Sequence, residues 1–270
     1  MRQHLLLPDP DDPRLTEPVV GIDQEGRSVE AAIVHERPLT LFLNGQEIVT
    51  MMTIGDHPDY LAVGYLLNQN MLRADDVITA VEHDEELELV VVRTERQTDF
   101  ETKLQKKVRT SGCAQGTAFG DLMEKFDRVR LPENARIRTS WLYGLMRQIN
   151  TLPSLYLKAG AIHGCALCEE DRILVYLEDV GRHNAVDKVI GHQLLLGRLP
   201  LDPAILLVSG RASFEVVQKA ASAGVPIVCA VSAPSSLAID LARRLDLTLV
   251  GFLRPGRMNV YHDRGRIELG

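Results

Sequence analysis

Four short apolar runs in the second half of the chain each end in a turn rich in Gly, Ser and Arg. The runs cover residues 172–177, 204–208, 225–231 and 247–253. Three of the turns lead into amphipathic stretches of helical length, which predicts βαβαβ units and a mainly parallel sheet. Such turns meet at the carboxyl edge of the sheet, where backbone N–H groups and helix N-termini favour anions. Because arginine adds a forked donor that fits phosphate, we expect a phosphorylated ligand there, although a single Ser-Gly turn is more often only a turn and a helix cap.

Length and charge narrow the class of protein. The chain has 270 residues and a net charge of −7. This acidic balance disfavours general nucleic-acid binding, which needs a basic face. No apolar run approaches the roughly 18 residues of a membrane span, and the apolar N-terminal stretch is too short for a signal peptide. We expect a cytoplasmic protein that binds neither nucleic acid nor membrane and keeps its four cysteines reduced.

The chain is expected to divide near residue 150. Residues 1–18, rich in proline and acidic side chains, are predicted to form a flexible acidic tail. Residues 19–150 are predicted to form a smaller α+β part, and residues 151–270 an α/β part that binds the cofactor. The two parts are compatible with one shared core.

The N-terminal part has one strong local signal. Asn44-Gly45 stands between alternating apolar runs and predicts a hairpin over residues 39–52 with a type I′ turn. A helix is predicted to open next, with Asp56 as its N-cap and Pro58 in its first turn. Two further strands and a helix are predicted over residues 77–82, 87–94 and 140–150.

Cys113 lies in a run of small residues, 110–117, that is expected to be a mobile loop. Several cations precede it, namely Lys103, Lys106, Lys107 and Arg109. Nearby positive charge lowers the pKa of a thiol, and the thiolate is the nucleophile. We therefore expect Cys113 to be reactive.

The other cysteines favour a structural role. Cys165 and Cys168 have a spacing that suits zinc or a dithiol, and His163 is close by. Their flanks are apolar, however, and on a strand two residues three apart point to opposite faces. Cys229, within an apolar run, is predicted to be in the core. We expect no bound metal.

With these features in place, the sequence resembles the formate dehydrogenase accessory sulfurtransferases, the FdhD family, from about residue 39 to residue 267. The resemblance is most specific over residues 178–188, Glu-Asp-Val-Gly-Arg-His-Asn-Ala-Val-Asp-Lys. It continues through Ser209-Gly210-Arg211, Lys219-Ala220, Ser232-Ala233-Pro234 and Asn259-Val260-Tyr261.

The resemblance implies a three-layer, cytidine-deaminase-like α/β sheet in the C-terminal part, and a homodimer. It also implies a sulfurtransferase activity. Proteins of this family take persulfide sulfur from a cysteine desulfurase and pass it to the molybdenum bis(molybdopterin guanine dinucleotide) cofactor. The sulfurated cofactor is then inserted into formate dehydrogenase.

Site residues follow from the same resemblance. The family's sulfur-carrying loop matches residues 110–116, where Cys113 is kept and Gly116 stands in place of a second cysteine. One thiolate is enough to accept a persulfide sulfur. The predicted cofactor-binding residues are Phe252, Leu253, Arg254, Pro255, Gly256 and Arg257, with Ser209, Gly210, Arg211 and Arg182.

Two other functions stay open at this point. A cofactor chaperone that binds and delivers without sulfuration is compatible with Gly116, because the second loop cysteine is missing. A deaminase-type zinc hydrolase is less compatible, because that chemistry needs a His-x-Glu and a Pro-Cys-x-x-Cys. Gly164 stands where the proline is needed.

Overall fold

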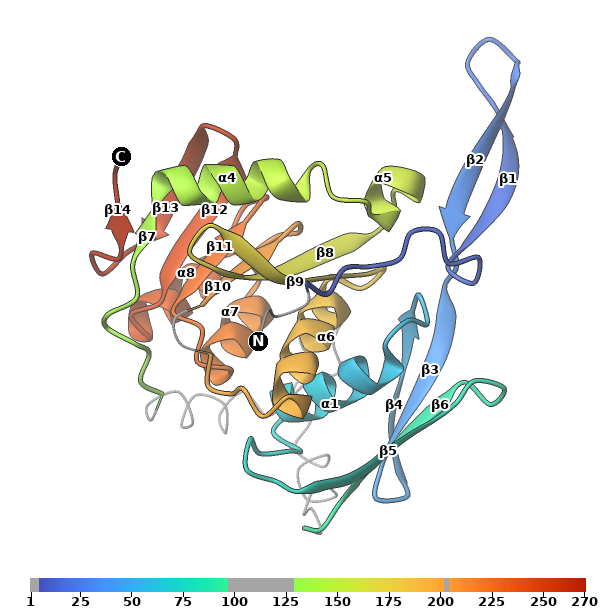
Figure 1. Ribbon diagram of the computed structural model, residues 1–270, viewed down its shortest axis with the longest axis horizontal. Helices are drawn as coiled ribbons and strands as arrows, with labels where there is room; N and C mark the ends of the chain where they lie inside the picture. The colour runs from blue at the N-terminus through green and yellow to red at the C-terminus, as the bar shows by residue number, and fades with distance from the viewer. Residues whose placement is uncertain (1–4, 97–128, 202–203) are drawn as a thin grey trace.

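The computed structural model describes residues 5–96, 129–201 and 204–270, so Cys113 and the rest of its predicted loop lie outside the described residues. A six-stranded sheet forms the C-terminal part, in the order β13-β12-β11-β10-β8-β9 (Figure 1). Its strands are β8 (His163–Glu169), β9 (Arg172–Asp179), β10 (Ile205–Val208), β11 (Ile227–Ala230), β12 (Thr248–Arg254) and β13 (Arg257–His262). All four predicted runs are therefore strands.

The sheet is mixed rather than mainly parallel. β10 pairs with β11, and β11 with β12, in parallel. β8 lies antiparallel between β10 and β9, and β13 is antiparallel to β12. Because β9 and β10 both oppose β8, strands β9, β10, β11 and β12 still run in the same direction. Their carboxyl ends lie at one edge of the sheet.

Helices cover both faces of this sheet (Figure 1). α6 (Arg182–Leu195), α7 (Phe214–Ser222) and α8 (Ser236–Arg244) pack on one face, and α4 (Thr139–Ile149) packs on the other. Side chains alternate between the two: Leu206 joins the α6–α8 side and Leu207 the α4 side. Strands that are apolar on both faces are typical of a sheet buried between helices. The α/β class is confirmed.

A four-stranded sheet, in the order β4-β3-β6-β5, forms the N-terminal part. Its elements are β3 (Arg37–Leu43), β4 (Gln46–Thr53), β5 (Ile78–Asp84), β6 (Leu89–Thr94) and the helix α1 (Pro58–Asn68). The predicted turn is confirmed, since Asn44 and Gly45 have φ angles of 50° and 88°. The predicted cap is wrong: His57 occupies the N-cap position of α1, and the Asp56 carboxylate instead accepts a hydrogen bond from Lys188.

The two parts meet where α1 crosses α6. A Cβ atom on Gly64 would lie 1.9 Å from the carbonyl oxygen of Asp187, and one on Gly191 would lie 1.9 Å from that of Tyr60. The helices are thus in direct backbone contact, which only glycine allows at these positions. The apolar core is continuous across both parts. α4, which precedes the predicted division near residue 150, packs on the C-terminal sheet.

The N-terminal residues differ from the expected solvated tail. The carbonyl of Leu6 accepts a hydrogen bond of 2.9 Å from the backbone N–H of Tyr176, and Leu15 is buried. Next come β1 (Thr16–Ile22) and β2 (Ser28–Val34), which pair with each other and with no other described strand. This hairpin, called the arm below, projects away from the body (Figure 1). None of the described helices is long and apolar enough to cross a membrane.

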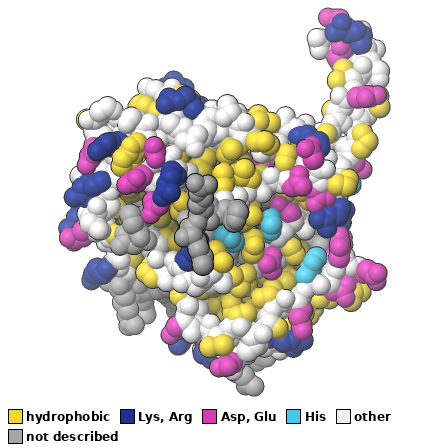
Figure 2. All heavy atoms as spheres, viewed as in Figure 1, with side chains coloured by type: hydrophobic (Ala, Val, Ile, Leu, Met, Phe, Trp, Pro, Cys, Tyr) yellow, Lys and Arg dark blue, Asp and Glu magenta, His cyan; other side chains and the backbone are white. Residues whose placement is uncertain are grey.

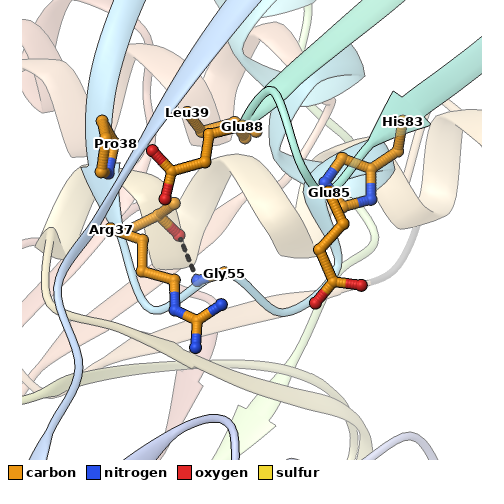
Figure 3. A pocket seen from close by; sticks show the side chains of 8 residues that line it. Arg37, Pro38, Leu39, Gly55, His83, Glu85 and Glu88 are labelled. Carbon is orange, nitrogen blue, oxygen red and sulfur yellow. Dashed lines mark hydrogen bonds between the residues drawn. The ribbon is translucent and has the colours of Figure 1, made fainter.

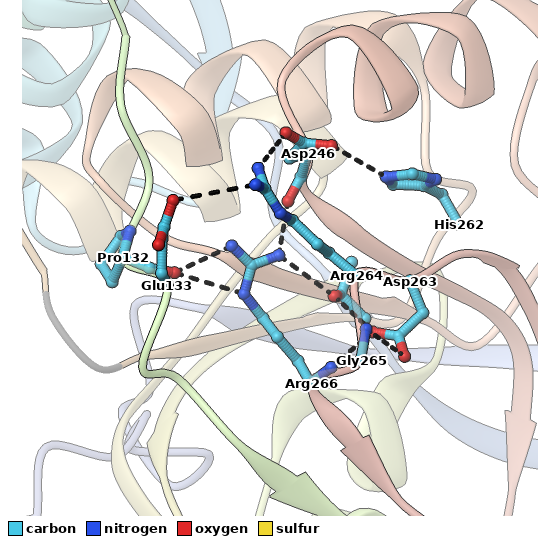
Figure 4. A network of polar contacts seen from close by, with 9 residues as sticks. Pro132, Glu133, Asp246, His262, Asp263, Arg264, Gly265 and Arg266 are labelled. Atoms are coloured by element: carbon cyan, nitrogen blue, oxygen red, sulfur yellow. Dashed lines mark hydrogen bonds and ion pairs between the residues drawn. The ribbon is translucent and has the colours of Figure 1, made fainter.

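Arg266 fixes the C-terminal end of the chain (Figure 4). Its side chain is buried, and its Nη2 donates to the carbonyl of Pro132 over 2.8 Å, while Nη1 donates to the carbonyl of Asp246. Arg264 pairs with the carboxylate of Asp246 beside it. The short strands β7 (Ile137–Arg138) and β14 (Ile267–Glu268) pair in parallel next to this network. The last turn of the chain is thereby attached to the segment that leads into α4.

Candidate functional site

The turns at the carboxyl edge of the six-stranded sheet bring several predicted residues together. Gly210 follows β10, and a Cβ atom placed on it would lie 3.5 Å from Cδ of Arg182 and 3.4 Å from Nδ1 of His163. His163 reaches this edge because β8 runs antiparallel and begins there. Ser209 Oγ accepts a hydrogen bond of 2.9 Å from the backbone N–H of Gly164. Arg182, Ser209 and Gly210 therefore form one surface with His163, as the sheet-edge argument predicts for the first three.

Arg182 has an unpaired donor at this surface. It is the first residue of α6, whose N-cap, Gly181, offers no side-chain cap. The Nε atom of Arg182 is buried and has no hydrogen-bond partner among the described residues. A buried donor without an acceptor costs free energy, about 1–3 kcal/mol. An anion at the helix N-terminus would satisfy this donor and complement the helix dipole.

The predicted segment after β12 lies further along the edge. Nη1 of Arg254 donates to the carbonyl of Val231 over 2.5 Å, which ties this turn to the one after β11. Phe252 is 42% exposed and has a φ angle of 51°. The side chain of Leu253 is fully buried and packs in the core, so it cannot contact a ligand. The remaining predicted residues are exposed, namely Pro255, Gly256 and Arg257, and so is Arg211 on the turn after β10.

The edge is long. Four strand spacings separate β9 from β12, and at about 4.8 Å each they span roughly 19 Å. Arginines stand at three of the turns along this length, Arg182, Arg211 and Arg254. The arrangement suits an extended ligand with several anionic groups better than a single small ion.

A buried carboxylate holds the first of these turns in place. Asp179 Oδ1 accepts hydrogen bonds of 2.9 Å from the backbone N–H of Gly181 and from the amide of Asn184. Its Oδ2 accepts one of 2.5 Å from Thr53 Oγ1 and lies 2.6 Å from Nζ of Lys188. Both charged side chains are fully buried. Asp179 therefore links the turn that carries Arg182 to strand β4 of the other sheet.

Two lysines complete this internal network. Lys188 also pairs with Asp56 and donates to the carbonyl of Glu178 over 3.1 Å. Burial alone would lower the pKa of Lys188, but the carboxylates of Asp179 and Asp56 outweigh it and raise the pKa. Lys219 lies 2.6 Å from Asp187, whose pKa is raised by burial. Unlike Arg182, the charged motif residues Asp179, Asp187 and Lys188 thus support the edge from inside rather than line it.

His183 is a neutral hydrogen-bonding group. Its Nε2 lies 3.1 Å from Oγ of Ser213 and 4.0 Å from a carboxylate oxygen of Glu215. Burial, reinforced by the charge of Lys219, lowers the pKa of His183 to about 4. The pKa of His163 is also lowered, first by burial and then by Arg182. Positive charge at this edge therefore comes from arginine at neutral pH. Sequence reasoning did not single out His183 outside the family motif.

The three described cysteines are buried in the core. Cys165, Cys168 and Cys229 have no exposed surface, and burial raises the pKa of each thiol. Cys165 packs on the α6–α8 side of β8 and Cys168 on the α4 side, which confirms the predicted alternation. They cannot share a metal ion. Within residues 5–96, 129–201 and 204–270, no three His, Cys, Asp or Glu side chains are grouped to hold one.

A small pocket elsewhere is not large enough for the expected ligand. It has a volume of about 30 Å³ and is lined by Arg37, His83, Glu85 and Glu88, among others (Figure 3). That volume holds about one water molecule. The pocket lies on the four-stranded sheet, where acidic side chains surround the single arginine. The carboxyl edge of the six-stranded sheet is the better candidate site.

Comparisons with known proteins show what the chain is similar to. The sequence profile of the FdhD/NarQ family matches residues 34–268. A protein named sulfur carrier protein FdhD from Streptomyces avermitilis is 41% identical over 253 residues, covering 88% of this chain and 89% of that protein. The protein of the same name from Bacillus subtilis is 36% identical over 241 residues, covering 89% and 92%.

A solved structure agrees with these relatives. The crystal structure of a proposed formate dehydrogenase accessory protein from Desulfotalea psychrophila superposes with a TM-score of 0.75 at 26% identity. The match covers 94% of this chain and 99% of that one. The family profile, the curated relatives and the solved structure all agree: the chain belongs to the FdhD/NarQ family.

Proposed function

We propose that this protein is a sulfur carrier of molybdenum cofactor maturation. In this proposal it takes persulfide sulfur from a cysteine desulfurase and transfers it to the molybdenum bis(molybdopterin guanine dinucleotide) cofactor. That cofactor is the substrate, which formate dehydrogenase then receives. The names of the relatives and of the structural neighbour support the sulfur-carrier role and the link to formate dehydrogenase.

The observation that carries the proposal is the burial of three of the four cysteines. Cys165, Cys168 and Cys229 are enclosed in the core with raised thiol pKa values, so none of them can reach a partner protein. Cys113 is left as the carrier. Its thiolate would attack the terminal sulfur of the donor persulfide, breaking the donor's S–S bond and releasing the donor cysteine as a thiolate.

The carboxyl edge would hold the nucleotide phosphates of the substrate. Arg182, with its unpaired Nε beside Gly210, supplies one donor group. Arg211 and Arg254 stand at the turns further along the edge. Arginine binds phosphate through paired N–H groups, and backbone N–H groups at a helix start add to this.

Mass spectrometry tests the sulfur step. After incubation with a cysteine desulfurase and cysteine, we expect the mass of one added sulfur atom on the peptide that contains Cys113. Cys113→Ala should lose it, whereas Cys168→Ala, a matched change at a buried cysteine, should keep it. Persulfide on another residue, or full formate dehydrogenase activity with Cys113→Ala in a strain lacking the natural protein, would contradict the assignment.

Calorimetric titration tests the phosphate site, with GDP as a fragment of the substrate. A charge-assisted hydrogen bond contributes about 1.5–3 kcal/mol, which is roughly a 10- to 150-fold change in affinity. Arg182→Ala, Arg211→Ala and Arg254→Ala should each weaken GDP by about that factor. The control is Arg27→Ala on the arm, where Arg27 is exposed and paired with Asp23. Equal affinity in all four variants would show that these turns are only turns.

The proposal includes a homodimer, located in the cytoplasm. Sedimentation of the purified protein would test the dimer. A second candidate function is a cofactor chaperone that delivers without sulfuration. The observation that favours it is Gly116, where the family's second loop cysteine is missing. Binding of GDP without any persulfide on Cys113 would select the chaperone.

A further inference from the structure

The arm exposes apolar side chains that no other described part of the chain covers. Five large apolar residues on it are between 38% and 78% exposed: Val19, Val20, Ile22, Val29 and Ile33. Figure 2 shows hydrophobic side chains along the projecting arm, with charged groups at its tip. A two-stranded hairpin by itself is marginally stable in water, because it lacks a second layer to pack on. Clustered exposed apolar residues are typical of a binding element.

The free edge of β2 offers an unbroken row of backbone groups. β1 and β2 pair only with each other, so the outer edge of each strand is unpaired within the described residues. β1 contains Pro18, which lacks an N–H group and protects an edge against pairing. β2 has no proline, and Val29, Ala31 and Ile33 alternate onto one of its faces. β2 is thus the strand to which an extended segment can be added.

A second apolar surface stands beside β2. The short helix α5 (Leu155–Ala159) contacts β2, as Figure 1 also shows. Its residues Tyr156 and Leu157 are 61% and 57% exposed. An added strand would therefore find apolar partners on the arm and on α5.

Charge disfavours a second copy of this chain as the occupant. Residues 16–34 contain four acidic residues, Glu17, Asp23, Glu25 and Glu30, and one basic residue, Arg27, so their net charge is −3. Like charges repel across an interface, whereas a basic partner would be attracted and steered to the arm. The occupant should therefore be a different protein with a basic segment.

The base of the arm borders the candidate site. Val34, at the end of β2, packs on a small core cluster that includes Ile162 and is bordered by Val180. Ile162 directly precedes His163, and Val180 lies between Asp179 and the turn that carries Arg182. A protein bound to the arm would thus sit at the rim of the edge where the substrate is held. The arm also lies outside the part matched by the family profile, which begins at residue 34.

We propose that the arm docks formate dehydrogenase, the enzyme that receives the cofactor, by adding an extended basic segment of that enzyme to the free edge of β2. This inference rests on the proposed function, which makes that enzyme the receiver. The bound enzyme would lie where the cofactor leaves the edge.

The test measures binding of purified cofactor-free formate dehydrogenase to the immobilised full-length protein. Replacing both apolar residues of β2, in the double variant Val29→Ser with Ile33→Ser, should weaken binding roughly tenfold or more, because two buried apolar contacts are lost. Glu30→Lys, a single surface change, should weaken binding and reduce its sensitivity to salt. The matched control is Val77→Ser, which changes an exposed valine (53%) directly before β5, away from the arm, and should leave binding unchanged.

Persulfide loading of Cys113 and GDP affinity are measured on the same variants, and both should equal the wild type. Wild-type binding by the double variant and by Glu30→Lys would overturn the inference. If the variants bind the enzyme normally but lose desulfurase-dependent loading, the arm binds the sulfur donor. If they bind the enzyme normally but change in oligomeric mass, the arm binds a second copy of the chain. Either result would also overturn the inference. Failure of the wild type to load persulfide would instead refute the proposed function. The binding assay does not depend on persulfide loading, so it still tests whether the enzyme binds through the arm.

Discussion

Removing the buried cation at Lys188 should destabilise the protein strongly. Lys188→Met keeps a side chain of similar length but leaves the fully buried carboxylate of Asp179 without the ammonium group 2.6 Å away. Breaking a buried ion pair from one side costs about 3–5 kcal/mol. Asp179 keeps three neutral hydrogen-bond donors, and Asp56 is partly exposed and hydrates, so we expect a loss of about 3–5 kcal/mol rather than more.

Urea denaturation followed by circular dichroism measures this change as a shift of the midpoint at constant slope. The matched control is Lys158→Met, because Lys158 is 36% exposed and lies 3.4 Å from Asp11; such surface pairs contribute about 0–1 kcal/mol. Adding Asp179→Asn to Lys188→Met should restore part of the loss by removing the unpaired charge. A Lys188→Met protein within about 1 kcal/mol of the wild type would refute the reasoning, since the pair would then not be buried as described.

Three further predictions concern stability. Gly64→Ala should cost about 3 kcal/mol, because the new methyl group would overlap the carbonyl oxygen of Asp187; unchanged urea stability would show that the helices separate easily. His183 should make the free energy of unfolding fall as the pH drops from 6.5 to about 4. Its pKa is lowered in the folded state, so in this range the unfolded chain binds the extra proton. The contribution is complete above pH 6.5 and is lost toward pH 4, about 3 kcal/mol in all. His183→Asn should flatten that part of the stability curve, and identical curves for the two proteins would contradict this. Cys168→Ser should cost about 1–3 kcal/mol by burying a hydroxyl without a partner, and a thermal midpoint equal to that of the wild type would mean that the hydroxyl finds one.

Local signals in the sequence predicted most of the strands and helices, but not the direction of β8. The run that forms β8 is apolar on both faces, and such a run carries no information about which neighbour it pairs with. Its direction follows from the tight turn to β9, where Glu170 has a φ angle of 53°. Glutamate does not signal a left-handed turn residue in the way that Asn-Gly does, so the β8–β9 hairpin was not predicted.

The packed N-terminal residues were missed for a related reason. Proline and acidic residues between 9 and 18 are typical of a solvated segment, yet Leu6 forms a bridge to Val175 at the edge of β9 and Leu15 is buried. These are single contacts to distant parts of the chain. Composition averages over such residues and cannot show them.

In the candidate site, too, the sequence predicts some contacts and misses others. The meeting of Arg182 with Gly210 follows from the rule that the carboxyl ends of parallel strands share an edge. The pairing of Lys188 with Asp56 has no local signal, because the two residues are 132 positions apart. Asp56 stands before a helix and looks like a cap, and only the crossing of α1 over α6 brings Lys188 to it.

The glycine contact between α1 and α6 also determines which motions the molecule can make. Helices slide past each other when a layer of side chains between them can adopt alternative packings, and here backbone touches backbone at Gly64 and Gly191. No such layer exists at this crossing. We therefore expect the four-stranded and six-stranded sheets to move as one rigid body. Under the proposed function, a large substrate would then enter and leave the edge by movement of its turns, not by domain closure.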